Sequence, residues 1–241
     1  MLCFRHELFV GVSNSLTLLS YSNTIRNDLA LSKVGKRIFL TVTYQRQRKT
    51  KDPCPGCFLH QSLCLCSEIP KLQLRTRICL VIHRKELKRT TNTGQLALRA
   101  LPNSEMKVRG TIDDQLDLTS ALDPNYFPLL FYPSENAIEL TPDYIAKIHK
   151  PILLIVPDGN WRQASKVNTR HPELKNIPRV MIRAKNLEDQ HLRQESTDYG
   201  MATLQAIAYA LGATDGEFVQ NELLKLYHLK LQRTLIGRGQ C

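Results

Sequence analysis

The fold is decided by the stretch Ile152-Leu-Leu-Ile-Val-Pro-Asp158-Gly-Asn-Trp-Arg162. Its first five residues are apolar and rich in β-branched side chains, which predicts a buried strand, and the Asp-Gly turn ends that strand. Open α/β sheets bind ligands at the carboxyl ends of their strands, so this turn is a candidate site. From this stretch alone, a capping role for Asp158 and a core position for Trp161 remain the alternative.

Similar patterns predict the rest of the main domain. Short apolar runs predict three further strands, at Ile78 to Ile82, Leu129 to Tyr132 and Val180 to Ile182. Helical spacing of apolar residues predicts helices after Asn92 or Thr93, over Trp161 to Asn168, over Leu204 to Leu211 with a stop at Gly212, and over Phe218 to Leu235. Strands that alternate with helices imply an α/β fold in which a mostly parallel sheet is covered by helices on both faces.

The length of 241 residues and the 42% hydrophobic content fit one globular domain with an appendage. We expect residues 1–51 to be a basic extension with a weak strand signal at Arg37 to Tyr44, residues 52–70 to be a zinc knuckle, and residues 71–241 to be the main domain. No apolar run approaches the roughly 18 residues of a membrane span. The first residues lack the pattern of a secretory signal, so we expect a soluble, cytoplasmic protein without membrane contact.

The formal net charge of +11 is concentrated in two segments. Residues 1–51 carry a net +7 and residues 71–109 a net +8, while the remainder is mildly acidic. Cations gathered in this way neutralise phosphates, which makes RNA or DNA the expected partner. A solvated basic face without a ligand is the alternative. The candidate nucleic-acid-binding residues are His83, Arg84, Lys85, Lys88, Arg89 and Arg109.

Four thiols lie within thirteen residues, in Cys54-Pro-Gly-Cys57 and Cys64-Leu-Cys66. Four thiolates suit tetrahedral Zn²⁺, and a site with all four positions filled is structural, because no position is left for water. A turn with incidental cysteines and a redox pair are the alternatives. We expect Cys3, Cys79 and Cys241 not to be metal ligands.

Further short motifs follow these cysteines in a fixed order. They are Ile82-His-Arg-Lys-Glu86, Asn92-Thr-Gly-Gln-Leu-Ala97, Leu101-Pro-Asn103, Arg109-Gly110, Leu130-Phe-Tyr-Pro133, Asp158-Gly-Asn-Trp-Arg-Gln-Ala164 and Ala202-Thr-Leu-Gln-Ala-Ile-Ala208. From Cys54 to about Leu211 the chain resembles the DTW-domain family, the tRNA-uridine aminocarboxypropyltransferases, which are related to the SPOUT-type RNA-modifying enzymes. It departs from the family pattern at Asn160, where the family has threonine, and at Gln205, where the family has glutamate.

The resemblance implies a SPOUT-like fold with a C-terminal trefoil knot. It also implies transfer of the 3-amino-3-carboxypropyl group of S-adenosylmethionine to N3 of a tRNA uridine, in the variable region or the D-loop, with release of methylthioadenosine. Uridine N3 must lose a proton before it attacks, and Asp158 is the candidate catalytic base. The basic residues named above, helped by the zinc knuckle, would bind the tRNA backbone. The candidate cofactor-binding residues are Tyr132, Pro133, Pro157, Asp158, Trp161, Arg162, Met201, Ala202 and Thr203.

Three other functions remain open at this point. An RNA methyltransferase with the same cofactor would release S-adenosylhomocysteine. A non-catalytic, zinc-containing RNA-binding protein would bind tRNA but not the cofactor. A ribosomal-RNA aminocarboxypropyltransferase would differ in substrate alone. No obligatory protein partner follows from the sequence, and the oligomeric state is open.

Overall fold

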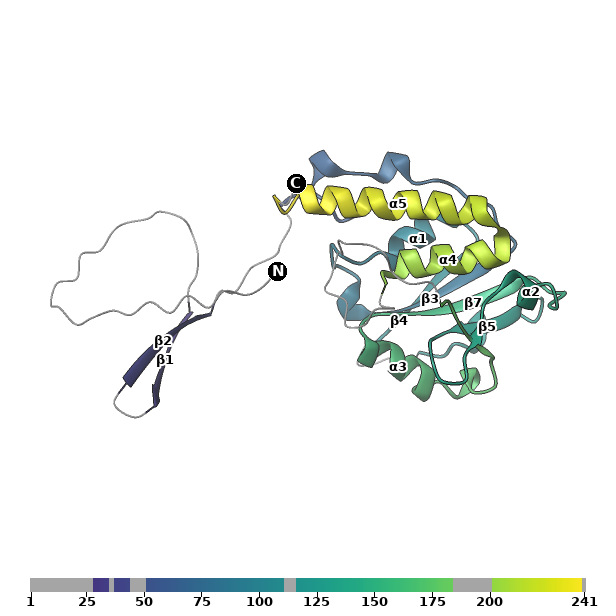
Figure 1. Ribbon diagram of the computed structural model, residues 1–241, viewed down its shortest axis with the longest axis horizontal. Helices are drawn as coiled ribbons and strands as arrows, with labels where there is room; N and C mark the ends of the chain where they lie inside the picture. The colour runs from purple at the N-terminus through teal and green to yellow at the C-terminus, as the bar shows by residue number, and fades with distance from the viewer. Residues whose placement is uncertain (1–27, 35–36, 44–50, 111–115, 184–200, 240–241) are drawn as a thin grey trace. The chain divides into compact units, whose positions relative to one another are not determined.

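The computed structural model describes residues 28–34, 37–43, 51–110, 116–183 and 201–239 (Figure 1). The chain divides into two compact units, Met1–Lys49 and Thr50–Cys241. In the first unit, β1 (Asp28–Val34) and β2 (Arg37–Thr43) form an antiparallel pair. The strand signal at Arg37 to Tyr44 is thereby confirmed as far as Thr43. The predicted division into an extension (1–51), a zinc knuckle (52–70) and a main domain (71–241) stays a prediction.

The second unit is built on a six-stranded sheet with the strand order β4-β3-β7-β5-β8-β6. Every neighbouring pair in it is parallel, so the carboxyl ends of the strands share one edge. The strands are β3 (Arg77–His83), β4 (Glu105–Arg109), β5 (Phe127–Phe131), β6 (Ile138–Glu139), β7 (Ile152–Asp158) and β8 (Arg179–Met181). The helices are α1 (Gly94–Ala100), α2 (Pro142–Ile145), α3 (Trp161–Arg170), α4 (Thr203–Asp215) and α5 (Glu217–Ile236).

Helices cover both faces of this sheet. In Figure 1, α1, α4 and α5 lie on one face and α3 lies on the other. Side chains of the central strands alternate between the two faces, as the two-residue period of a strand requires. Leu80 and Leu154 belong to the core on the α4 side, whereas Val81 and Ile155 pack with Val167 of α3. The predicted α/β fold, a mostly parallel sheet with helices on both faces, is confirmed.

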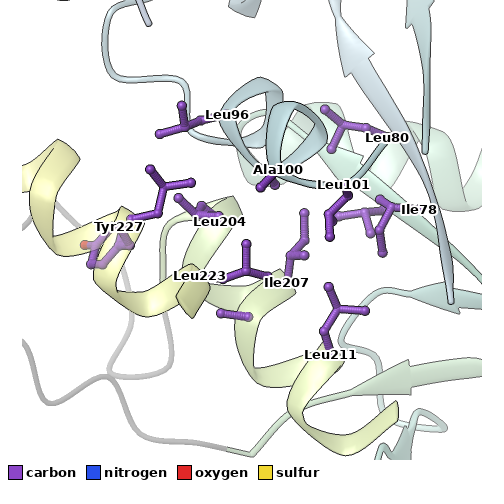
Figure 2. Packing of buried hydrophobic residues seen from close by; sticks show 14 of the residues in the cluster. Ile78, Leu80, Leu96, Ala100, Leu101, Leu204, Ile207, Leu211, Leu223 and Tyr227 are labelled. Atoms are coloured by element: carbon purple, nitrogen blue, oxygen red, sulfur yellow. The ribbon is translucent and has the colours of Figure 1, made fainter. Parts of the chain in front are cut away.

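The larger core fills the space between the sheet and the helices α1, α4 and α5 (Figure 2). Ile207 of α4 is fully buried there, and Tyr227 of α5 is 1% exposed. Leu59 and Leu65 belong to the same core, so the segment with the four cysteines packs against the helices of this unit. No helix in the described part of the chain is both long enough and apolar enough to cross a bilayer.

The structure contains elements that the sequence did not predict, and several boundaries differ by a few residues. The strands β1, β4 and β6 and the short helix α2 were not predicted, since each lacks a sustained apolar run. The strand predicted at Leu129 to Tyr132 is Phe127–Phe131, and α3 ends at Arg170 and not at Asn168. The predicted stop at Gly212 was wrong, because α4 continues to Asp215. A Cβ on Gly212 would lie 2.0 Å from Gln220 Oε1, so this glycine permits the close approach of α5 and does not end a helix. The predicted knot depends on residues 184–200, which lie outside the described ranges.

We expect Ile207→Ala to lower the free energy of unfolding by about 2–5 kcal/mol, because it leaves a cavity in the core beneath α4. Ile236→Ala is the control, since Ile236 is 44% exposed, and should change stability by less than about 0.5 kcal/mol. Urea unfolding measures both values. Equal losses for the two variants would contradict the position assigned to Ile207.

Candidate functional site

Polar side chains meet at the carboxyl edge of the sheet, where three adjacent strands end together. Asp158 ends β7 and is in register with Ile82 of β3. His83 ends β3 opposite Arg109, which ends β4. Asp158 is 5% exposed, so its carboxyl group lies just beneath the surface of this edge.

The two oxygens of Asp158 accept hydrogen bonds from two distant parts of the chain. Asn92 Nδ2 donates to Oδ2 at 2.6 Å, and Thr203 Oγ1 donates to Oδ1 at 2.5 Å. The backbone N–H of Leu204 donates to Thr93 Oγ1 at 3.1 Å, which joins the starts of α1 and α4 directly. We call the four residues Asn92, Thr93, Asp158 and Thr203 the Asp158 junction.

Close packing around this junction explains the small residue that follows Thr93. A Cβ on Gly94 would lie 3.0 Å from Asp158 Oδ2 and 3.1 Å from Leu80 Cδ2. A side chain at this position would therefore crowd the Asp158 carboxylate and Leu80, which would have to shift by a few tenths of an ångström. Each carboxylate oxygen has two lone pairs, so the bonds from Asn92 and Thr203 do not by themselves exhaust Asp158 as an acceptor.

The turn after Asp158 is shaped to start α3. Gly159 has a φ of 146°, a backbone conformation that L side chains rarely adopt. Asn160 is the N-cap of α3: its Oδ1 accepts from Gln163 N at 2.9 Å, and its own N–H donates to Gln163 Oε1 at 2.8 Å. Asparagine and threonine both cap helices, so the departure of Asn160 from the family pattern keeps this local structure.

The departure at Gln205 falls in the first turn of α4. Gln205 is 1% exposed and belongs to the buried side of that helix. A neutral amide is cheaper to bury than a carboxylate, so glutamine lowers the cost of burial relative to glutamate at this position.

Trp161 is not a core residue, because it is 49% exposed. Its ring lies edge-on to that of Tyr132, with 6.4 Å between the ring centroids.

In the turn that follows Tyr132, Ser134 Oγ is buried with no hydrogen-bond partner among the described residues. A buried hydroxyl of this kind fits a site that receives a ligand with polar groups.

The structure brings some of the candidate cofactor-binding residues into contact with one another. Asp158 contacts Thr203, and Tyr132 contacts Trp161. No contact between these two pairs is established, and the assignment of all nine residues to the cofactor stays a prediction. Of the others, Pro157 lies half-buried in β7, Met201 and Ala202 lie half-buried just before α4, and Pro133 and Arg162 are exposed.

The candidate RNA-binding residues differ in their surroundings. Arg84, Lys85, Lys88 and Arg89 are exposed in and after the turn η3 (Arg84–Glu86), which directly follows β3. Glu86 is buried, and its Oε1 lies 3.2 Å from Arg89 Nε. The carboxylate of Glu86 therefore balances part of the charge of Arg89.

Two of the candidate RNA-binding residues point toward the protein. Arg109 is 9% exposed, and its Nη1 donates to Gln163 O at the start of α3 at 2.7 Å. Burial, followed by the nearby cation of Arg170, lowers the pKa of Arg109. His83 Nδ1 accepts from Lys85 N at 3.2 Å, and burial together with the cation of Arg109 lowers the pKa of His83. Both residues therefore have structural contacts whether or not RNA binds.

A second group of cations, which was not singled out from the sequence, lies on α3. Arg162, Lys166 and Arg170 recur at four-residue spacing, which puts them on one side of the helix. This helix has no acidic residue, and none of the ion pairs formed between described residues involves these three cations. The four-residue spacing of these cations in the sequence could have indicated that they share one side of a helix.

The four cysteine thiols form one cluster, with all Sγ atoms within 4.8 Å of one another. Three of the sulfur–sulfur distances are 3.4, 3.6 and 3.9 Å. A tetrahedral zinc site with Zn–S bonds of about 2.3 Å places its sulfurs about 3.8 Å apart, so the cluster fits Zn²⁺.

Contacts around the cluster shift the pKa values of its thiols in opposite directions. Backbone N–H groups, first that of Cys57 and then that of Gly56, lower the pKa of Cys54 to about 6, whereas burial and the neighbouring sulfurs raise the pKa of Cys66 to about 12. Near these sulfurs, burial lowers the pKa of Lys230 to about 8, while the cysteine charges oppose that shift. Cys79 lies apart from the cluster in β3, and Cys3 and Cys241 lie outside the described residues.

We expect Asn160→Ala to lower the free energy of unfolding by about 1 kcal/mol, because the first turn of α3 loses its cap. Asn160→Thr restores a capping side chain and should stay within about 0.5 kcal/mol of the natural chain. Urea unfolding of both variants measures the difference. If both lose the same amount, Asn160 acts by something other than capping.

The family comparison covers most of the chain. The DTW domain matches residues 51–235. Similar curated proteins are tRNA-uridine aminocarboxypropyltransferase 2 of Macaca fascicularis, 24% identical over 73% of this chain and 61% of the relative, and that of Mus musculus, 24% identical over 71% and 60%. The Drosophila melanogaster protein of that name is 25% identical over 68% of this chain and 67% of the relative. The chain thus spans about three fifths of the length of the two mammalian relatives.

Among solved structures, the SAM-dependent rRNA:acp-transferase Tsr3 from Vulcanisaeta distributa is similar, with a TM-score of 0.45 and 20% identity over 69% of this chain and 80% of that one. This likeness is too distant to carry an argument about the site. The family match alone covers well over half of the chain, and with it the four cysteines, the Asp158 junction and Trp161. The chain belongs to the DTW domain family.

Proposed function

We propose that this protein is a tRNA-uridine aminocarboxypropyltransferase, which transfers the 3-amino-3-carboxypropyl group of S-adenosylmethionine to N3 of a uridine, with the variable region of tRNA as the expected position. The observation that carries the proposal is the Asp158 junction, an acid held at the carboxyl edge of a parallel sheet. The names of the curated relatives support the same reaction. We also propose a cytoplasmic location, on the sequence features described above.

Asp158 is the proposed catalytic base. Uridine N3 carries a proton and is a poor nucleophile until that proton is removed. Asn92 and Thr203 both donate hydrogen bonds to the carboxylate oxygens of Asp158. These bonds fix its orientation, which a base needs if it is to meet a proton held at one position.

Nine residues are proposed to hold S-adenosylmethionine around the same edge: Tyr132, Pro133, Pro157, Asp158, Trp161, Arg162, Met201, Ala202 and Thr203. The cofactor supplies an electrophilic carbon next to its sulfonium, with methylthioadenosine as the leaving product. The exposed ring of Trp161 would provide a flat apolar wall, and the guanidinium of Arg162 would pair with a carboxylate or a phosphate. The buried hydroxyl of Ser134 would bond a polar group of the bound cofactor.

The cations flanking this edge, all exposed except the half-buried Lys166, are the proposed contact with tRNA. Arg84, Lys85 and Lys88 follow β3, and the α3 cations Arg162, Lys166 and Arg170 follow β7. Since β3 and β7 are neighbours, the two groups begin at adjacent strand ends. Contacts of this kind bind phosphates and fix position without reading sequence. The four cysteines are proposed to hold a structural Zn²⁺.

The products identify the reaction. The purified protein is incubated with unmodified tRNA and S-adenosylmethionine, and mass spectrometry of nucleosides and small molecules should find aminocarboxypropyl-uridine and methylthioadenosine. A methylated nucleoside with S-adenosylhomocysteine would overturn the proposal in favour of a methyltransferase. Tight tRNA binding without cofactor binding or product would indicate a binding protein, and modification of ribosomal RNA alone would change the substrate.

We expect Asp158→Asn to reduce transfer by about 100-fold or more, the range for loss of a general base. Thr203→Val keeps the carboxylate but removes one donor to it, and should reduce transfer by about tenfold, the value of one hydrogen bond to a charged group. Asp143→Asn, an exposed acid on α2, is the control and should not change the rate. Unchanged turnover of Asp158→Asn would remove Asp158 from the mechanism.

Charge reversal tests the proposed tRNA contact. Lys85→Glu with Lys88→Glu should weaken tRNA binding and flatten its dependence on salt, because fewer counterions are released from the RNA. Lys147→Glu with Lys175→Glu is the matched control, since both lysines are exposed and precede β7 and β8, at the opposite edge of the sheet. Filter binding at several salt concentrations measures both effects. Equal weakening in the two double variants would indicate a response to net charge alone.

A further inference from the structure

A buried lysine joins the C-terminal helix to the four-cysteine cluster. Lys230 of α5 is 1% exposed, and its Nζ donates to the backbone oxygen of Cys57 at 2.6 Å. The two residues are 173 positions apart in sequence. Lysine is almost never fully buried unless a partner compensates its charge, and a single neutral carbonyl compensates it poorly.

A second cation, one turn further along α5, reaches the other half of the cluster. Arg233 Nη1 donates to the backbone oxygen of Cys64, and Arg233 Nη2 pairs with Glu68. Lys230 therefore contacts the residue that closes the first cysteine pair, and Arg233 contacts the residue that opens the second. The two contacts hold both halves of the cysteine segment against the same helix.

The charge of a metal-loaded cluster explains why a lysine is buried here. Four thiolates around Zn²⁺ carry two net negative charges. The sulfurs are packed within 4.8 Å of one another, and Lys230 is bonded to the backbone of one of the four cysteines. An ammonium at this position balances part of that charge, whereas the same ammonium beside four neutral thiols has no counter-charge there.

We propose that Lys230 is a positioning residue for the metal: its buried ammonium balances the charge of the zinc-loaded cysteine cluster, so that metal binding and the docking of α5 stabilise each other. Groups outside the ligand shell affect metal affinity in this way when they bond to the ligands or their backbone. The inference does not depend on the reaction that the protein catalyses.

The test compares Lys230→Met, which keeps the length of the side chain but removes its charge, with Lys225→Met on the same helix. Lys225 is 74% exposed and pairs with Glu222. Zinc affinity is measured by competition with a chromophoric chelator, and melting temperature is measured with zinc and with excess chelator. We expect Lys230→Met to bind zinc about 10- to 100-fold more weakly. Lys225→Met should bind it as the natural chain does.

The two melting temperatures separate this role from a merely structural one. If Lys230 balances the metal site, Lys230→Met lowers the melting temperature of the zinc-loaded protein and leaves that of the chelated protein unchanged or higher, because a costly buried charge is gone. Lys230→Arg, which keeps the charge, should recover part of the zinc affinity. Equal loss of melting temperature in both states, with unchanged zinc affinity, would overturn the proposal.

If Lys230→Met does not fold, hydrogen exchange of the natural chain decides the question. Removal of zinc should increase exchange at the backbone amides of α5 around Lys230, and re-addition should restore protection. Exchange in α5 that does not respond to zinc would overturn the proposal.

Discussion

The architecture of the site depends on one carboxylate. Asp158 receives a hydrogen bond from the loop before α1 and another from the first residue of α4, so one side chain ties the central strand to two helices. Thr93 completes the connection, because its hydroxyl oxygen accepts a hydrogen bond from the backbone N–H of Leu204 in α4. These hydrogen bonds matter because Asp158 is buried, and burying a carboxylate without hydrogen-bond donors would cost free energy of folding. The same contacts that stabilise the fold therefore orient the group to which we assign the chemistry.

Much of this was predictable because it is local. The apolar run before Asp158 predicts a buried strand, the four cysteines predict a site whose thiols lie close enough to hold a metal ion, and the strand and the thiol cluster are both present. The partners of Asp158 were not predictable from periodicity, since Asn92 and Thr203 lie 66 and 45 positions away. The family resemblance grouped these motifs in order along the chain, but it did not indicate which side chains would touch. Such pairings depend on how the strands are arranged, and no local pattern encodes that.

The number of cations in a segment of sequence does not say which of them are exposed in the structure. The basic segment around β3 was predicted as a single RNA-binding group, yet Arg109 bonds inward to α3 while Lys85 and Lys88 face solvent. Conversely, Arg162, Lys166 and Arg170 lie on one side of a helix that the charge count did not single out, and the two outer cations are exposed. On the opposite face of the sheet, Lys230 of α5 is a cation that solvent does not reach. Net charge therefore indicates a kind of partner, whereas burial decides which cations are available to it.

The strand order has a consequence for how the chain acquires its structure. β7 lies between β3 and β5, and β8 lies between β5 and β6, so each of these later strands enters between two that precede it in the chain. On a ribosome, β3 and β5 would emerge before the strand that joins them, and neither could complete its pairing until β7 followed. Pairings between distant segments form slowly. The nascent chain would therefore carry unpaired strand edges until β7 and β8 have emerged, which is the stage at which chaperones protect a protein from aggregation.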